Sequence, residues 1–205
     1  MTRACSNFPT RRRALALALG LAGAATLAPG IGARQARAQA GLDRLRRTDP
    51  ARPLPDFAFT TADGTRRTLA DVPARGWVIN LWGTWCAPCR EEMPALDRMA
   101  AALKADNIAL LALAWEFGPN PAENVARFYA QHGIVNLAVW LDPRGAAGRV
   151  LAVPPAEPGA RPASARYPTT LLVNATRQEV ARAEGALAWD SAEAIAAVRR
   201  YLSAG

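Results

Sequence analysis

Residues 81–94 read LWGTWCAPCREEMP and place Cys86 and Cys89 between an apolar run and a segment with helical spacing. One other cysteine, Cys5, lies near the start of the chain. Two cysteines at this C-x-x-C spacing can form a structural disulfide, bind a metal ion or carry out redox chemistry. The surrounding residues help to distinguish these three uses.

A metal site is poorly supported, because a closed zinc site needs four ligands and the pair supplies two. The sequence has no second C-x-x-C motif, and His132 is its one histidine. A C-x-x-C-H haem attachment site is excluded because Arg90 follows Cys89. We therefore expect no metal and no cofactor. A structural disulfide remains an alternative, although so short a loop stabilises a chain little.

The local pattern favours redox chemistry at the pair. The apolar run 77–82 predicts a strand buried on both faces, and apolar residues at helical spacing predict a helix from Pro88. Cys86 would then lie at the helix N-terminus, where free N–H groups and the helix dipole stabilise a thiolate. Cys89, one turn on, would be shielded and could resolve a mixed disulfide.

The remaining patterns predict an α/β sandwich around a mixed sheet. The expected elements are a hairpin turning at 63–64, strands at 77–82, 108–114 and 137–141, helices from 88 and over 120–132, a hairpin of 169–174 with 178–184, and a last helix capped by Asp190 and Glu193. Glu116, at the end of the strand at 108–114, is expected as a loop acid, with a position near the cysteines as the alternative. Four prolines between 154 and 162 predict a surface loop.

The formal net charge of +8 is concentrated at the N-terminal end of the chain. Residues 1–38 hold six of the 25 basic residues and no acidic residue, so the remainder is close to neutral. This distribution argues against a nucleic-acid-binding surface on the folded part. We expect no nucleic-acid partner.

Residues 1–38 are typical of a signal peptide. Three arginines at 11–13 precede an apolar stretch at 14–28, and Ala36-Arg37-Ala38 offers a cleavage site. The stretch is short for a membrane span, which needs about 20 residues, but an uncleaved anchor remains an alternative. We expect export by this leader, an extended lead-in at 39–55 and the folded domain at 56–205.

The segment NLWGTWCAPCREEMP, residues 80–94, resembles the active-site segment of the TlpA/ResA-like periplasmic thiol–disulfide oxidoreductases. The resemblance extends from about Pro55 to the last helix. It implies a thioredoxin-like sandwich, with a central mixed sheet flanked by helices and an N-terminal β-hairpin addition. Leu81 and Gly83 replace the family's usual Phe and Ala, changes that we expect to be chemically minor.

The resemblance also assigns roles to individual residues. It implies a redox disulfide between Cys86 and Cys89, and it matches Glu92 to a buried acid that sets cysteine pKa values and carries protons. A solvated surface position is the alternative for Glu92. Asn80 stands where cytoplasmic thioredoxins carry a buried Asp, which leaves Glu92 as the candidate proton carrier. The implied substrate-binding residues are Trp85, Pro88 and the cis-proline loop of Tyr167, Pro168 and Thr169.

We predict a periplasmic reductant of protein disulfides, because Ala87 and Pro88 between the cysteines offer no group that would strongly stabilise a thiolate. The resemblance implies apocytochrome c or copper-site proteins as clients and a membrane-bound thiol relay as electron donor. Two alternatives remain. One is a copper or haem chaperone. The other is a peroxiredoxin, which would carry Thr or Ser where Gly83 stands.

Overall fold

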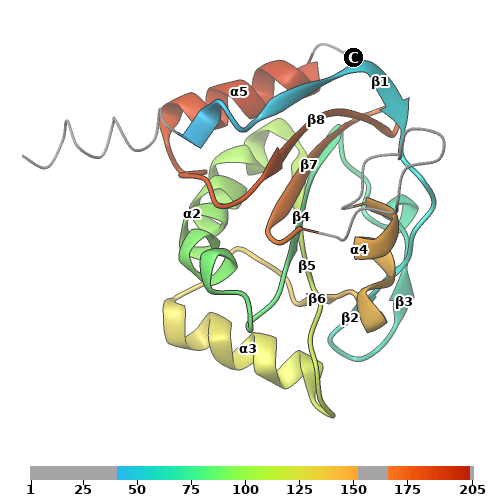
Figure 1. Ribbon diagram of the computed structural model, residues 1–205, viewed down its shortest axis with the longest axis vertical. Helices are drawn as coiled ribbons and strands as arrows, with labels where there is room; N and C mark the ends of the chain where they lie inside the picture. Colours follow the sequence, from blue (N-terminus) through green and yellow to red (C-terminus); the bar gives the residue numbers. More distant parts are fainter. Residues whose placement is uncertain (1–40, 152–165, 204–205) are drawn as a thin grey trace, which may run out of the picture.

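The computed structural model describes residues 41–151 and 166–203. The predicted signal peptide and most of the predicted proline-rich loop lie outside the described residues. Within them, eight strands form one mixed sheet with four α-helices packed against it (Figure 1). None of the helices in these two ranges is both long and apolar enough to cross a membrane.

The sheet has the strand order β1-β8-β7-β4-β5-β6-β2-β3. Its strands are β1 (Arg46–Pro53), β2 (Phe59–Thr61), β3 (Arg66–Arg67), β4 (Gly76–Trp82), β5 (Ile108–Ala114), β6 (Trp140–Leu141), β7 (Thr169–Asn174) and β8 (Gln178–Glu184). The helices are α2 (Ala87–Leu103), α3 (Pro121–His132), α4 (Ala146–Leu151) and α5 (Ala192–Ser203), with 3-10 turns η1 (Leu69–Asp71), η2 (Lys104–Asp106) and η3 (Pro143–Gly145).

Strand β4 is central, and every one of its residues is buried. It pairs in parallel with β5 and antiparallel with β7, so that both of its edges are hydrogen-bonded. A continuous apolar run suits a strand covered on both faces. The strand predicted at 77–82 is therefore confirmed.

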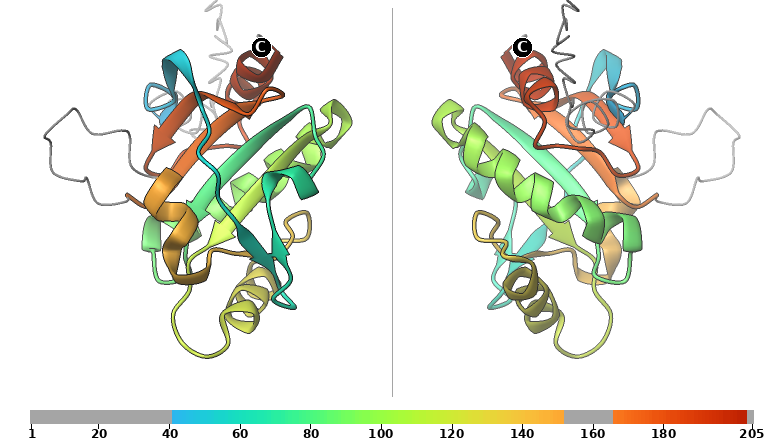
Figure 2. Two further views of the ribbon diagram at one scale, coloured as in Figure 1. Left: turned by 90° about the vertical axis from the view of Figure 1, so that its right-hand side faces the viewer. Right: turned by 90° about the vertical axis from the view of Figure 1, so that its left-hand side faces the viewer.

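The alternation of side chains along β4 divides the core into two layers. Val78 and Trp82 pack with α2, α3 and α5, whereas Ile79 and Leu81 pack with Leu151 of α4. Figure 2 shows α2 crossing one face of the sheet and α4 lying on the other. This arrangement is the expected sandwich.

Several expected elements are confirmed near their predicted bounds. The hairpin turn at 63–64 joins β2 to β3, and Gly64 has a φ of 83° there, in the region that favours glycine. Gly133, with a φ of 64°, ends α3 as expected. The hairpin of β7 and β8 also forms where predicted.

Two expectations about the elements need correction. The strand expected at 137–141 is shorter in the fold, where only Trp140 and Leu141 form β6 and pair with Leu113 and Ala114 of β5. The cap of α5 is Ser191, whose Oγ accepts the N–H of Ala194 at 3.1 Å, and not Asp190. Asp190 instead pairs with the Arg98 guanidinium at 2.9 Å.

Two elements were not expected from the sequence. Part of the extended lead-in forms β1, which pairs antiparallel with β8 at the edge of the sheet. The short helix α4 begins after Asp142, whose carboxylate accepts the N–H groups of Ala147 and Gly148 at 2.7 and 2.8 Å. A carboxylate in this position satisfies N–H groups that the first turn leaves unpaired.

Candidate active site

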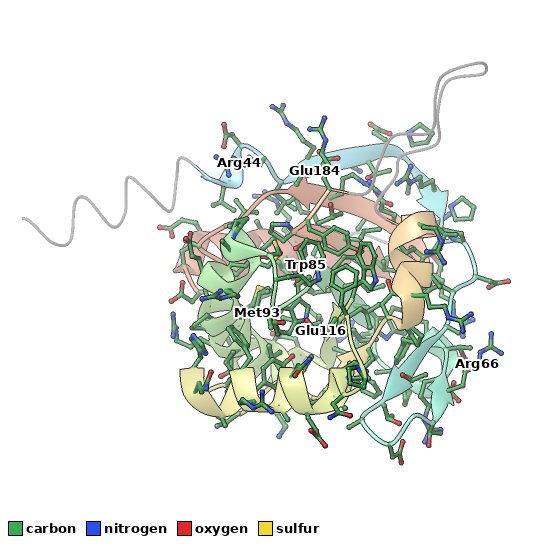
Figure 3. All side chains as sticks on the ribbon, turned by 60° about the horizontal axis from the view of Figure 1, so that its bottom comes forward. Arg44, Arg66, Trp85, Met93, Glu116 and Glu184 are labelled. Atoms are coloured by element: carbon green, nitrogen blue, oxygen red, sulfur yellow. A yellow bond between two sulfur atoms is a disulfide. The ribbon has the colours of Figure 1, made fainter. Side chains whose placement is uncertain are left out.

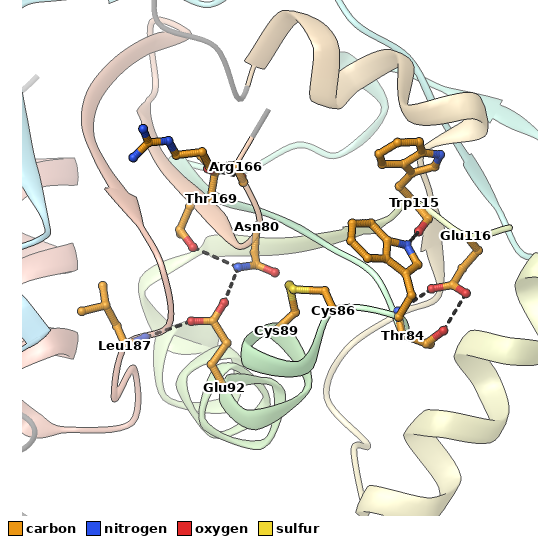
Figure 4. The surroundings of a disulfide bond; sticks show 12 residues. Asn80, Thr84, Cys86, Cys89, Glu92, Trp115, Glu116, Arg166, Thr169 and Leu187 are labelled. Atoms are coloured by element: carbon orange, nitrogen blue, oxygen red, sulfur yellow. Dashed lines mark hydrogen bonds between the residues drawn. A yellow bond between two sulfur atoms is a disulfide. The ribbon is translucent and has the colours of Figure 1, made fainter. Parts of the chain in front are cut away.

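Cys86 and Cys89 form a disulfide at the N-terminal end of α2 (Figure 4). Cys86 is the N-cap residue and keeps 6% of its surface exposed, whereas Cys89 is completely buried. Both cysteines are thus buried in the disulfide form, and Cys86 is the more exposed of the two, which is the expected order.

The start of α2 follows from local interactions. The Cys86 N–H donates to the Gly83 carbonyl at 3.1 Å and closes a turn, and the Arg90 N–H donates to the Cys86 carbonyl as the first helical bond. Pro88 lies in the first turn, where a missing N–H costs nothing. The first turn carries no acidic side chain, so nothing within it offsets the positive end of the helix dipole next to Cys86.

Glu92 lies one helical turn beyond Cys89 and is only 3% exposed. Its carboxylate accepts three hydrogen bonds, from Asn80 Nδ2 and Trp189 Nε1 at 2.9 Å and from the Leu187 N–H at 3.0 Å. Burial raises the pKa of Glu92 to about 7, against the opposing effect of these hydrogen bonds. A carboxyl group with such a pKa can both take up and release a proton near neutral pH.

Asn80 connects Glu92 to β7, the strand that follows the cis-proline loop. Its Nδ2 donates to Glu92 Oε1 and to Thr170 Oγ1, each at 2.9 Å. Its Oδ1 is buried and accepts no hydrogen bond from the described residues. The β4–β7 register explains this contact, because Asn80 lies directly opposite Thr170.

The peptide bond between Tyr167 and Pro168 is cis, and this loop leads into β7. Pro168 and Thr169 are buried, and the Thr169 hydroxyl donates to the Arg166 carbonyl at 2.6 Å. The Thr169 side chain is thus occupied within the loop. Tyr167 reaches the active-site loop, since its ring centroid lies 5.5 Å from that of Trp85.

Trp85 belongs to a cluster of four aromatic rings next to the disulfide, with Trp115, Phe117 and Tyr167. Trp85 and Phe117 are 45% and 58% exposed. Neither Trp115 nor Phe117 was among the site residues expected from the sequence. Their position directly after β5 could have indicated a place in the site, because the C-terminal ends of neighbouring parallel strands lie at the same edge of a sheet.

Gly83 is required by close packing. A Cβ at this position would collide with the Trp85 indole and would lie 2.7 Å from the Trp115 carbonyl oxygen. The family's usual Ala would therefore not fit this loop unless the Trp85 indole or the loop backbone moved.

No cluster of three or more His, Cys, Asp or Glu side chains suited to a metal ion occurs within residues 41–151 and 166–203. His132 lies at the end of α3, stacked on the Phe128 ring with centroids 4.1 Å apart. Its Nδ1 is 2.9 Å from the Phe128 carbonyl oxygen.

Comparison with known proteins adds sequence relatives. Residues 50–181 match the AhpC/TSA family. The chain is 31% identical over 91 residues to the thioredoxin-like protein YneN of Bacillus subtilis, covering 44% of this chain and 52% of that protein. It is 32% identical over 80 residues to the thiol-disulfide oxidoreductase ResA of Geobacillus thermodenitrificans, covering 39% and 44%. The chain thus spans about half the length of the curated relatives it matches.

Solved structures support the fold. A secreted thiol-disulfide isomerase from Corynebacterium glutamicum has a TM-score of 0.58 and 21% identity, with 76% of this chain and 91% of that chain covered. A DsbF homologue from Corynebacterium diphtheriae has a TM-score of 0.56 and 21% identity, covering 75% and 92%. These matches confirm the expected thioredoxin-like fold, and the ResA relatives confirm the resemblance found in residues 80–94. With the family match spanning more than half of its length, this chain belongs to the AhpC/TSA family.

Proposed function

We propose that the protein is a periplasmic thiol–disulfide oxidoreductase that reduces disulfides in client proteins. The observation that carries the proposal is the position of Cys86, at the N-terminal end of α2 and more accessible than the buried Cys89. A thiolate at a helix N-terminus is stabilised by the dipole and by free N–H groups.

The reaction runs in two thiol–disulfide exchanges. The Cys86 thiolate attacks one sulfur of the client disulfide, which forms a mixed disulfide and releases the other client sulfur as a thiolate. Cys89 then loses its proton and attacks Cys86 Sγ, which forms the Cys86–Cys89 disulfide and releases the second client thiolate. Two electrons pass to the client, and the client thiolates take up two protons.

Glu92 is the proposed acceptor of the Cys89 proton. Its carboxyl group lies on the same side of α2 as Cys89, because residues three apart on a helix share a face. The pKa of about 7 suits transfer in both directions near neutral pH. A disulfide-bonded cysteine carries no proton, so this role arises only during reduction of a client.

Substrate contacts in the proposal come from the rim of the site. Trp85 and Pro88 are exposed next to the cysteines in the chain, and Tyr167, which precedes Pro168, lies against the Trp85 ring from the cis-proline loop. Buried Thr169 contributes through its backbone at the start of β7. An extended client segment laid along this rim would bring its disulfide to Cys86.

The proposal also covers the location of the protein, its clients and its electron donor. The predicted leader favours export, and so does the likeness to the secreted thiol-disulfide isomerase of Corynebacterium glutamicum. The proposed clients are apocytochrome c or copper-site proteins, and the proposed electron donor is a membrane-bound thiol relay. These parts rest on the resemblance of residues 80–94 and on the relatives named ResA.

The test is disulfide reduction by the purified protein in a Cys5→Ser background, so that only the active-site pair reacts. With insulin as the model client and a chemical thiol as electron source, we expect turnover that Cys86→Ser abolishes. Copper bound tightly through Cys86 and Cys89 without any reductase activity would favour the chaperone. Rapid consumption of hydrogen peroxide would favour the peroxiredoxin.

A further inference from the structure

The segment Trp115–Phe117, which follows β5, lies against the loop Gly83–Trp85 that precedes the cysteines. The parallel register of β4 and β5 brings them together, because Trp82 lies opposite Ala114 and the Trp115 N–H donates to the Trp82 carbonyl at 2.9 Å. Figure 3 shows Trp85 and Glu116 near one another on the same side of the molecule. A backbone hydrogen bond thus links the two segments just ahead of the active-site helix α2 in the chain.

Both carboxylate oxygens of Glu116 accept hydrogen bonds from one residue of this loop, Thr84. Oε1 accepts the backbone N–H of Thr84 at 2.6 Å, and Oε2 accepts the Thr84 hydroxyl at 2.7 Å (Figure 4). Hydrogen bonds to a charged acceptor are shorter and stronger than neutral ones. The neighbouring Trp115 carbonyl accepts the Trp85 indole N–H at 2.7 Å, so both residues that precede Cys86 are fixed by this segment.

The Glu116 carboxylate is also a negative charge close to the redox pair. Thr84 is two residues from Cys86, which limits the distance from the carboxylate to the Cys86 Cα to about 11 Å. No Arg or Lys side chain in residues 41–151 and 166–203 forms an ion pair with Glu116. A carboxylate that is partly buried is screened less than an exposed one, so its field acts against a thiolate at Cys86.

We propose that Glu116 is a positioning residue of the redox site, which fixes the loop ahead of Cys86 through Thr84 and biases the cysteine pair toward the disulfide form. The bias makes the dithiol a better electron donor, and in that sense the inference rests on the proposed function. From the sequence alone, an ordinary loop acid was the main expectation for Glu116, and a position near the cysteines was the alternative. In the fold it has a partner in the active-site loop.

The decisive variant is Glu116→Gln in the Cys5→Ser background, because the amide keeps an acceptor for Thr84 and removes the charge. Equilibration with glutathione is expected to show a three- to tenfold shift toward the dithiol, which is about 14 to 30 mV less negative. The Cys86 thiol is expected to titrate at lower pH, as followed by its rate of alkylation.

Two control variants distinguish the effect of the Glu116 charge from the effect of changing a side chain in general. Glu193→Gln makes the same change of charge at an exposed position on α5 and is expected to leave the equilibrium with glutathione unchanged. Glu116→Asp retains the charge and is expected to stay within twofold of the parent protein. Unfolding midpoints measured in parallel show whether each variant is folded.

Thr84→Val tests the positioning role, since it removes the hydroxyl donor and leaves the Glu116 charge in place. We expect kcat/KM for insulin to fall several-fold, with a potential close to that of the parent.

An equilibrium constant for Glu116→Gln equal to that of the parent would overturn the inference. The proposed function fails separately, if the parent protein reduces no disulfide. A shifted equilibrium in Glu116→Gln would then still support the assignment of Glu116.

Discussion

Asn80 donates a hydrogen bond of 2.9 Å to the buried carboxylate of Glu92, one turn of α2 beyond Cys89. The same amide leaves its Oδ1 without a partner among the described residues. Rotation of the amide by 180° would present this oxygen to Glu92. The protonated carboxyl group would then have an acceptor, so Asn80 can serve both protonation states.

The first prediction concerns the pH dependence of stability. Glu92 has a pKa of about 7 in the fold against 4.5 in the unfolded chain. The native state therefore binds the proton more tightly, and its stabilising contribution is complete below pH 4.5 and lost as the pH rises through about 7. The expected loss is about 3 kcal/mol, of which burial is the main cause. Glu92→Gln removes this dependence.

Urea unfolding of the oxidised protein between pH 4.5 and 7.5 measures the effect. Glu91→Gln is the matched control, because Glu91 is the adjacent acid and is exposed. We expect the parent and Glu91→Gln to lose stability in parallel over this range, with Glu92→Gln nearly flat. Equal slopes for all three proteins would show that Glu92 does not titrate in this window.

The second prediction concerns the order of the two exchanges. Cys89→Ser removes the resolving thiol and leaves the more accessible Cys86 free to attack. We expect this variant to accumulate a mixed disulfide with a client peptide, and Cys86→Ser to form far less of it because Cys89 is buried. Mass spectrometry after acid quenching measures both. Equal trapping by the two variants would contradict the assigned roles.

The central part of the site was predictable because its signals are local. The apolar run of β4, the helical spacing of α2 and the turn between them are read from adjacent residues, so the placement of Cys86 at the helix end followed. The cis peptide at Pro168 was different. It followed from the resemblance alone, since most X-Pro bonds in folded proteins are trans.

The rest of the site depends on long-range pairing that no local pattern contains. Thr84 and Glu116 are 32 residues apart and meet through the β4–β5 register. Strand β1 was missed because its sequence, RRTDPARP, has no apolar alternation and most of its residues are exposed. Helix α4 has six residues, too few to show a helical period.

The third prediction tests the packing of the active-site loop. Gly83→Ala adds a Cβ that would meet the Trp85 indole and the Trp115 carbonyl. The loop or the indole must move, and overpacking of this kind costs about 1–3 kcal/mol. We expect a lower unfolding midpoint and slower insulin reduction. Gly64→Ala serves for comparison, because it has no atom within 4 Å of the added Cβ. Gly64→Ala is expected to lose stability through backbone strain, because Gly64 has a positive φ, but it leaves the active-site loop unchanged. Only Gly83→Ala is therefore expected to slow insulin reduction.

The fourth prediction concerns the attachment of β1. The Arg52 guanidinium donates to the buried Glu179 carboxylate of β8 at 2.6 and 3.0 Å, and Arg182 shares the same carboxylate. Burial alone would raise the pKa of Glu179, but its hydrogen bonds with Arg182 and Arg52 outweigh burial and lower it. Arg52→Ala is expected to destabilise the protein by about 1–3 kcal/mol.

Hydrogen exchange of the β1 amides provides the readout for this variant. We expect faster exchange across 46–53 in Arg52→Ala and little change in β4. Arg66→Ala, at an exposed position in β3 with no ion pair to a described residue, is the control. Unchanged exchange in β1 would mean that the backbone pairing with β8 holds the strand without Arg52.

The reduction potential of the Cys86–Cys89 pair tests the central claim most directly. The Cys5→Ser protein is equilibrated against defined ratios of reduced and oxidised thiol, and its tryptophan fluorescence reports the fraction reduced. We predict a value near that of thioredoxin, about −270 mV, as a dedicated reductant requires. A value near −120 mV, typical of a strong oxidant, would contradict the proposed direction of electron flow.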